Sequence, residues 1–322
     1  MVKMVNMNEA HTTHAPCRSN GFTFVELLVV MAIIAVLAAL MLPAMSATRV
    51  NQQALTCLSH YNQLMKACVM YTGDYHDFYP PNPDDGGTTP GYEWVSGDVE
   101  GWMPEIEAGG NAEAGNLTYL TSPAYSVLAP YILAPHTNGN AAVFKCPTDP
   151  RICAYQGKHV PVVRSCSCNG GVGTVDPGFL NSGGGSHSGI PTIPAPGPWL
   201  TGSHEEFQSQ YATFGKASAF KICSPAEIFV YDDESPWSIN DGCFVLSARV
   251  SEVVDWPTFM HQGAGVFSFA DGHAEIHKWK SNLFALDTPA NFAAVPANSP
   301  GYQDWYWLAW HATRSSVTGT VP

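Results

Sequence analysis

The chain has 322 residues, with 14 Lys and Arg against 27 Asp and Glu, and a formal net charge of −13. The few basic side chains form no cluster, which argues against nucleic-acid binding. Only 13% of the residues are charged, and 29 glycines and 25 prolines are present. This composition favours a globular part rich in loops and strands over a helical bundle.

The first predicted element is an apolar helix that begins with Gly-Phe-Thr-Phe-Val-Glu at residues 21–26. Between Phe22 and Thr48 the only ionisable side chain is Glu26. Residues 25–45 are long enough to cross a bilayer core of about 30 Å at about 1.5 Å per residue, so we predict a transmembrane segment there. A carboxylate in such a segment costs about 2.5–3.5 kcal/mol on insertion scales, and we expect it to have a partner or a function.

This pattern resembles the prepilin family, the precursors of type IV pilins and of type II secretion pseudopilins. The resemblance implies that a prepilin peptidase cuts after Gly21, removes residues 1–21 as a leader and methylates Phe22. It also implies that Glu26 pairs with the terminal amine of a neighbouring subunit during assembly, and that Pro43 stands where many members carry a helix-loosening proline. A secretory signal peptide fits less well, because its apolar region is about 7–15 residues and is cut on its C-terminal side.

After the apolar run the helix pattern becomes amphipathic, with apolar side chains recurring at three and four residues up to about Tyr71. Gly73 and Asp74 supply a stop signal. We therefore predict a spine helix over residues 22–72 and a globular β-rich head over residues 73–322. The predicted fold class is α+β and pilin-like, with the amphipathic half of the helix packed on an antiparallel β-sheet that carries long loops.

Eight of the nine cysteines follow the leader: Cys57, Cys68, Cys146, Cys153, Cys166, Cys168, Cys223 and Cys243. Thiols pair in an oxidising compartment, so disulfides are expected, although the sequence does not assign their connectivity. Cys57 and Cys68 lie about three helical turns apart on nearly one face, so each can reach a head cysteine but not the other. Cys166 and Cys168 would share one face of a strand. The C-x₂₋₄-C spacing typical of structural zinc is absent, which argues against a zinc site.

Within the head, residues 73–125 are predicted to be a long irregular connection. The predicted elements after it are a short helix over residues 124–133, short strands over 143–147 and 228–231, and a hairpin with strands over 266–270 and 273–279. A two-residue Asp271-Gly272 turn would join the hairpin strands, because both positions tolerate positive φ.

Nine residues separate His261 from Asp271-Gly272. Together with the N-terminal motif, this spacing resembles the C-terminal H-X9-DG signature of a large pseudopilin-like family of planctomycete- and verrucomicrobium-type bacteria. The amphipathic run after Cys57, the block at residues 144–150 and the acidic strand end at residues 232–234 also resemble that family. Its molecular role is poorly defined, so the resemblance implies architecture more than activity.

Two interpretations of the signature stay open. The residue types of a hard-cation or zinc site, or of an acid/base pair, occur at His261, Asp271, His273, Asp232, Asp233 and Glu234. The predicted ligands of Ca²⁺ or another divalent cation are His261, Asp271, Asp232 and Glu234. Alternatively, Asp271 and Gly272 only form the turn, and His261 braces the strand before it. The sequence contains no nucleophile elbow, zincin motif or phosphate-binding loop, so we predict that the protein is not an enzyme and has no cofactor apart from such a cation.

The C-terminal region contains an aromatic cluster made of Tyr302, Trp305, Tyr306, Trp307 and Trp310. Its spacing fits core packing, and it also fits a sugar-binding or interface surface.

The predicted function is that of a structural subunit, anchored by a single pass in the inner membrane, with its head in the periplasm or in an extracellular filament. It would assemble with other pilin or pseudopilin subunits into a type IV pilus-like filament or a type II secretion pseudopilus after processing by the prepilin peptidase and N-methyltransferase. The alternative is a membrane-anchored binding module whose head captures a glycan or a divalent cation.

Overall fold

A computed structural model of the chain describes residues 21–82, 93–99, 113–132, 141–175, 193–194, 211–287 and 293–320, with no side-chain description at 40–50, 174–175 and 193–194. All but the last residue of the predicted leader therefore lies outside the described residues. The chain divides into two units, residues 1–48 and 49–322, which are described separately below. We call the second unit the head. It includes the amphipathic half of the predicted spine helix as well as residues 73–322.

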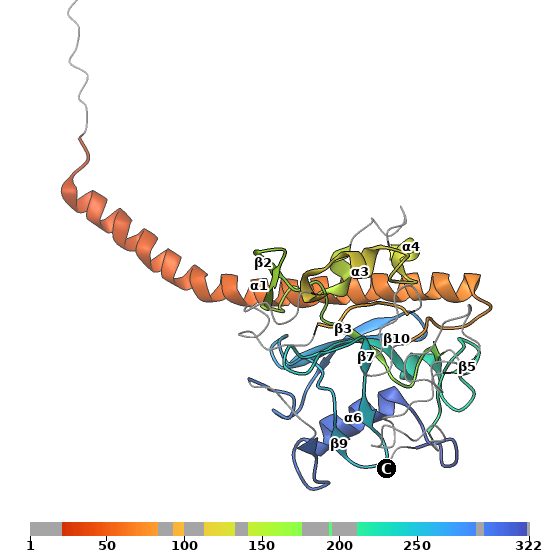
Figure 1. The fold of residues 1–322 in the computed structure, drawn as a ribbon. Helices are drawn as coiled ribbons and strands as arrows, with labels where there is room; N and C mark the ends of the chain where they lie inside the picture. The colour runs from red at the N-terminus through yellow and green to blue at the C-terminus, as the bar shows by residue number, and fades with distance from the viewer. Residues whose placement is uncertain are drawn as a thin grey trace, which may run out of the picture. The chain divides into compact units, whose positions relative to one another are not determined.

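Helix α1 (Phe24–Asp74) begins in the first unit, extends into the head, and closely matches the predicted spine helix (Figure 1). A capping box fixes its start, since the Thr23 N–H donates to Glu26 Oε2 at 2.8 Å and the Glu26 N–H donates to Thr23 Oγ1 at 3.2 Å. Gly73 does not stop the helix, because it lies inside the last turn. The chain leaves the helix at His76 and Asp77, which have φ of 54° and 72°.

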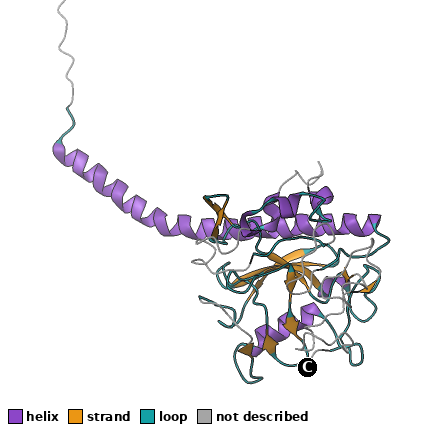
Figure 2. Cartoon of the chain, viewed as in Figure 1, coloured by secondary structure: helices purple, strands orange, loops and turns teal. Residues whose placement is uncertain are grey.

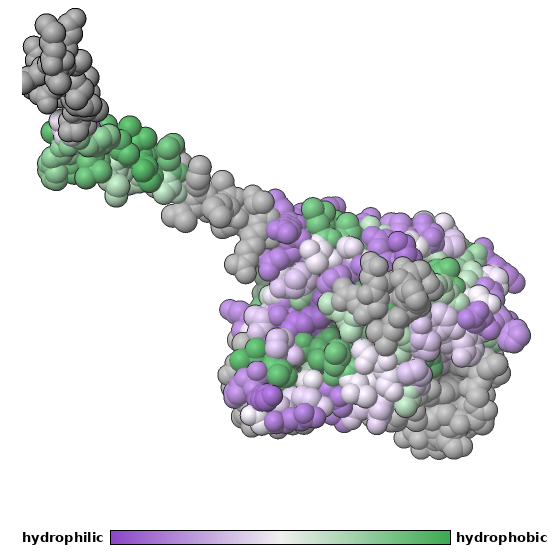
Figure 3. All heavy atoms as spheres, turned by 90° about the horizontal axis from the view of Figure 1, so that it is seen from above, coloured by the Kyte–Doolittle hydropathy of each residue, from purple (hydrophilic) through white to green (hydrophobic). Residues whose placement is uncertain are grey.

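In the first unit, the described part of α1 exposes large apolar side chains along its length, from Phe24 to Leu37 (Figure 3, green). Across the part of the chain that the structure describes, no helix is both long and apolar enough to cross a membrane. The transmembrane segment over residues 25–45 stays a prediction, and the side chains at 40–45 are among those not described.

In the head, the amphipathic half of α1 buries one face. The buried side chains of this face include Cys57, Tyr61, Leu64, Met65, Cys68 and Tyr71, whose spacing of three and four residues is the predicted one. Tyr61 also donates its hydroxyl to the carbonyl of Asp232 at 2.8 Å, which ties the helix to the sheet. Cys57 and Cys68 share the buried face, as predicted.

The central sheet has the strand order β11-β10-β6-β3-β7, with bounds β11 Ala274–Lys278, β10 Ala264–Phe269, β6 Phe229–Asp233, β3 Cys166–Asn169 and β7 Cys243–Phe244. Its first four strands pair antiparallel, but β3 and β7 run parallel, so the sheet is mixed rather than antiparallel as predicted. Helix α1 covers one face and α6 (Tyr302–Ala312) lies over the other (Figure 2). The arrangement is α+β, as predicted.

Smaller elements surround this sheet: the hairpin β1 (Ile152–Tyr155) and β2 (Lys158–Pro161), the pair β4 (Thr174–Val175) and β5 (Ile193–Pro194), the strands β8 (Leu246–Ser247), β9 (Glu252–Val253) and β12 (Ala293–Ala294), and the short helices η1 (Glu113–Gly115), α3 (Thr118–Thr121), α4 (Ala129–Ile132), η3 (Ala141–Phe144) and η5 (Pro225–Glu227). The short helix predicted over residues 124–133 contains α4.

The strand predicted over residues 143–147 is wrong, because η3 and a turn occupy this segment. The Lys145 N–H donates to the Ala142 carbonyl at 3.1 Å, and the Cys146 N–H donates to Ser165 Oγ at 2.6 Å. Pro147 has no N–H to offer. The N–H groups of Lys145 and Cys146 therefore bond to a nearby carbonyl and to a side chain, and they are not available to pair with a neighbouring strand.

The predicted buried strand over residues 228–231 is confirmed as β6, and the predicted hairpin is confirmed as β10 and β11. Its turn differs from the prediction. The Phe269 N–H donates to the His273 carbonyl, which leaves a three-residue loop in place of a two-residue turn. Among these loop residues only Gly272 has positive φ, at 98°, as in a type I turn closed by a glycine bulge. Asp271 accepts the His273 N–H at 3.1 Å, which favours this loop.

Gly272→Ala is expected to lower the free energy of unfolding of the chain by about 1 kcal/mol, because alanine disfavours positive φ. A Cβ at Gly272 meets no atom within 4 Å, so the cost comes from the backbone alone. Thermal and urea unfolding of the purified protein measure it. Gly73→Ala is the control, since Gly73 has no positive φ and no close neighbour. Equal stability of the two variants would contradict the backbone argument.

Candidate functional site

The first candidate site is the segment that precedes α1. A Cβ built on Gly21 meets no atom within 4 Å and its φ is not positive, so the fold of the described residues does not require glycine there. Phe22 is 73% exposed. The Glu26 carboxylate accepts the Thr23 hydroxyl at 2.7 Å in addition to the Thr23 N–H, so its partner within one chain is the second residue after the predicted cleavage site. The side chain of Pro43 is not described, and the helix is continuous at its position.

The second candidate site is a buried cluster of four side chains from four segments. The ligand-type atoms of Cys57, Cys146, Asp233 and His261 all lie within 4.8 Å of one another. Cys57 belongs to the buried face of α1, Cys146 follows η3, Asp233 ends β6 and His261 precedes β10. Each is at most 5% exposed. We call these residues the Cys-Cys-Asp-His cluster.

The contacts inside the cluster converge on two atoms. His261 Nε2 lies 3.0 Å from Asp233 Oδ2 and 3.2 Å from Cys146 Sγ. Asp233 Oδ2 also accepts from the Cys57 thiol at 3.5 Å. The other ring nitrogen, Nδ1 of His261, has no hydrogen-bond partner among the described residues. The orientation of the imidazole is therefore set through Nε2.

The pKa values of the cluster respond to burial and to each other. Desolvation raises the pKa of Cys57 and of Asp233 well above their ordinary values. For Cys146 desolvation acts upward too, but hydrogen bonds from Cys57 and His261 outweigh it and lower the pKa well below its ordinary value. For His261 desolvation acts downward, while hydrogen bonds to Asp233 and Cys146 raise the pKa to about 10. The contact between His261 and Cys146 thus shifts their two pKa values in opposite directions.

This arrangement does not suit nucleophilic catalysis. A catalytic histidine uses one ring nitrogen toward the nucleophile and the other toward the orienting carboxylate. Here both Cys146 and Asp233 contact Nε2. In addition, the sulfur of Cys146 belongs to a residue that is 2% exposed, so a substrate has no access to it in this structure.

Of the four predicted cation ligands, only His261 belongs to the cluster. Asp271 lies at the exposed hairpin loop, where its carboxylate pairs with His273 Nδ1 at 2.6 Å. Glu234 accepts hydrogen bonds from the hydroxyls of Ser167 and Ser238. Both carboxylate oxygens of Asp232 are buried without a hydrogen-bond partner among the described residues. Side chains alternate along a strand, so Asp233 faces α1 and its two neighbours in sequence do not.

Sequence reasoning named Asp233 with His261 among the residue types of a cation site, but it missed Cys57 and Cys146. It noted each within a separate motif, but no spacing in the chain joins positions 57, 146, 233 and 261. All eight cysteines after the predicted leader are free thiols in the structure, so the disulfides expected from the sequence are not observed among them. Cys166 and Cys168 do share one face of β3, as predicted, since both belong to the core that packs on α1.

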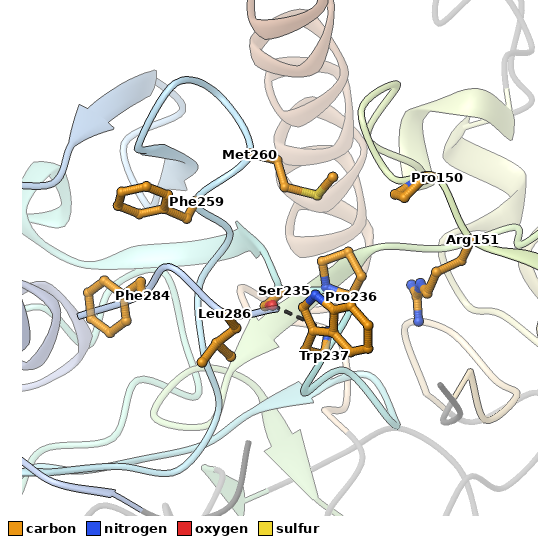
Figure 4. A pocket seen from close by; sticks show the side chains of 9 residues that line it. All are labelled: Pro150, Arg151, Ser235, Pro236, Trp237, Phe259, Met260, Phe284 and Leu286. Carbon is orange, nitrogen blue, oxygen red and sulfur yellow. Dashed lines mark hydrogen bonds between the residues drawn. The ribbon is translucent and has the colours of Figure 1, made fainter. Parts of the chain in front are cut away.

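A mostly apolar pocket of about 120 Å³ is lined in part by Met260, the residue before His261 in the sequence (Figure 4). Its other lining residues are Pro150, Arg151, Ser235, Pro236, Trp237, Phe259, Phe284 and Leu286. The Arg151 guanidinium is already engaged, because it donates to both carboxylate oxygens of Asp149 and to the carbonyls of Val99 and Arg164. Ser235 Oγ accepts the Trp237 N–H at 3.2 Å. Arg151 and Ser235 are therefore already engaged within the protein, and most of the pocket lining is apolar.

The C-terminal aromatic cluster is divided between core and surface. Trp305 is fully buried, whereas Tyr302, Tyr306, Trp307 and Trp310 line an open groove together with Lys280 and Gln303. Tyr306 and Trp310 lie one turn apart on α6, with stacked rings 6.1 Å apart. Core packing is confirmed for Trp305, and the sugar-binding or interface interpretation stays a prediction for the four residues that line the groove.

The comparisons with known proteins concern the N-terminal segment. Residues 17–42 match the family model described as the prokaryotic N-terminal methylation motif. The chain therefore carries the processing motif of type IV pilin-like proteins, at the place where Gly21, Phe22 and Glu26 stand. The match does not extend into the head. No curated protein and no solved structure matches the chain.

Proposed function

We propose that the protein is a pilin or pseudopilin subunit that is processed at Gly21, anchored by its N-terminal helix in the inner membrane and assembled through that helix into a filament. The observation that carries the proposal is the N-terminal methylation motif at residues 17–42. The partners would be the prepilin peptidase, which is also the N-methyltransferase, and other pilin or pseudopilin subunits. The head would face the periplasm or the outside of an extracellular filament.

The first half of α1 supports this proposal. Its described side chains are almost all apolar and exposed, with Phe24 73%, Val25 67% and Val36 60% accessible. A contiguous apolar surface of this kind is unfavourable in water, and lipid or the helices of neighbouring subunits would cover it. Glu26 would then be the one charge in an apolar setting, where its cost favours pairing with the amine of Phe22 on another subunit.

Glu26→Ala is expected to leave membrane insertion intact or improved, because the substitution removes a costly carboxylate. Filament assembly is expected to fall to near zero, because the incoming terminal amine loses its counter-charge. The measurement compares the sheared filament fraction with the membrane fraction of the same cells. Unchanged filament yield would contradict the proposed pairing.

Two further variants separate charge from helix capping. Glu26→Gln keeps an acceptor for the Thr23 N–H but removes the charge, so it is expected to fail in assembly as Glu26→Ala does. Asp287→Ala removes an exposed acidic side chain of the head and is expected to assemble normally.

A second candidate function is ligand binding by the head on the same anchor. The open groove on α6, about 560 Å³ in volume, favours it, because aromatic rings lie beside the polar ends of Lys280 and Gln303. Planar apolar rings with polar groups at their edge are typical of sites that bind sugars. Binding of the purified protein to a glycan array tests this candidate. Filament formation by the wild-type protein without any glycan binding would contradict it and leave the structural role as the only proposed function.

A further inference from the structure

We propose that the Cys-Cys-Asp-His cluster binds one zinc ion, which fastens the spine helix α1 to the central sheet. Cys57, Cys146, Asp233 and His261 would supply two sulfurs, one oxygen and one nitrogen to the ion. All four residues belong to the head, and the proposal does not rest on the filament role.

The distances within the cluster match the edges of a tetrahedral zinc site. With bonds of about 2.3 Å to sulfur and about 2.0–2.1 Å to nitrogen and oxygen, tetrahedral geometry places ligand atoms about 3.3–3.8 Å apart. The observed separations are 3.0 Å for nitrogen and oxygen, 3.2 Å for nitrogen and sulfur, and 3.5 Å for sulfur and oxygen. The two shorter edges need outward shifts of a few tenths of an ångström, and the three remaining pairs of ligand atoms lie within 4.8 Å of one another.

Hydrogen bonding alone satisfies the four groups poorly. When His261 Nε2 carries a hydrogen, one N–H faces both Asp233 Oδ2 and Cys146 Sγ, and the further partner of Cys146 Sγ is the Thr148 hydroxyl at 2.8 Å. Four buried polar groups in a dry interior are also costly unless each has a partner. A divalent cation at the centre would contact one ligand atom of each group.

The donor set selects the metal. Thiolate sulfurs favour zinc and other soft ions, whereas Ca²⁺ and Mg²⁺ take oxygen ligands almost exclusively. The Ca²⁺ site considered from the sequence is therefore not the one these residues fit. Since all four ligands are protein side chains and all are buried, the site has no open coordination position and would be structural rather than catalytic.

The position of the cluster explains what the ion would do. Its ligands come from α1, the segment after η3, the end of β6 and the turn before β10, which are far apart in sequence. A zinc ion would thus cross-link the amphipathic half of α1 to two strands of the sheet. Because the unfolded chain has no such preformed site, binding energy would appear as folding energy.

The experiment is metal analysis of the full chain, purified in detergent without chelator. We expect one zinc per chain by elemental analysis, and a lower melting temperature after chelation that zinc restores and Ca²⁺ does not. Cobalt substitution is expected to give the thiolate-to-cobalt charge-transfer absorption of a tetrahedral site. These wild-type measurements do not depend on any variant being able to fold.

Variants then assign the ligands. Cys57→Ser and Cys146→Ser are each expected to weaken zinc binding at least tenfold and to reduce the charge-transfer absorption. Cys68→Ser and Cys166→Ser are the matched controls, because both cysteines are fully buried in the same core but lie outside the cluster. An equal loss in these controls would overturn the assignment.

Two results would overturn the site itself. Intact mass lower by two hydrogens, with Cys57 and Cys146 joined in one peptide and no zinc bound, would show a disulfide instead. Free thiols and no zinc in the protein, with a melting temperature insensitive to chelator and to added zinc, would show that the four groups form only a buried hydrogen-bonded cluster.

Discussion

Gly21→Val is expected to leave the chain uncut, with no detectable mature form. The peptidase of type IV pilin-like proteins has to accommodate the residue before the cut bond, and a branched side chain there would keep that bond out of the active site. The fold gives no other reason for a loss, since a Cβ at Gly21 touches nothing within 4 Å and its backbone is not in the left-handed region. Mass spectrometry of the membrane fraction detects the mature N-terminus at Phe22 or its absence.

Gly73→Val is the control, because Gly73 also has no neighbour within 4 Å of a built Cβ but lies far from the cleavage site in sequence, in the last turn of α1. It is expected to be processed normally. A mature N-terminus found elsewhere in the wild-type chain, for instance beyond Ala38, would contradict the pilin-like processing and with it the proposed function.

Arg164→Met is expected to destabilise the head by roughly 3 kcal/mol or more. Arg164 is fully buried, and its guanidinium donates to the carbonyls of Cys166 at 2.9 Å, Asp241 at 2.5 Å and Gly97 at 3.2 Å. Methionine fills similar space but leaves these carbonyls without that donor, and each unsatisfied buried group costs about 1–3 kcal/mol. Urea unfolding of the purified chain measures the loss.

Arg249→Met serves as the control, because Arg249 is exposed on the same domain. Its effect is expected to stay within about 0.5 kcal/mol, as for most surface substitutions. If the two arginine variants lost equal stability, the buried guanidinium would not be holding these loops together.

Much of the fold was predictable because it follows from local patterns. The apolar and amphipathic halves of α1, the buried strand β6 and the hairpin β10–β11 each have a periodicity that one segment carries alone. The failures come from contacts that the segment alone does not show. Residues 143–147 look like a strand by composition, but Ser165, 19 residues after Cys146, takes the N–H of Cys146. The hairpin loop gained a residue because Asp271 accepts the His273 N–H.

The candidate metal site shows the opposite case. His261 could be selected from its sequence signature, but its expected partner Asp271 is the exposed loop residue that pairs with His273. Its actual neighbours come from three other segments. A zinc site was disfavoured on the absence of paired cysteines, and that rule covers only sites built from local spacing.

The sequence by itself therefore determined the N-terminal motif, the spine helix and the α+β class, because a cleavage motif, a helical periodicity and a hairpin are properties of contiguous residues. Only the tertiary structure decided which acidic residue faces α1, and that Cys57, Cys146, Asp233 and His261 meet. The reason is geometric: strand alternation turns Asp233 toward the helix and its neighbours away, and packing of α1 on the sheet then brings Cys57 within 3.5 Å of that carboxylate.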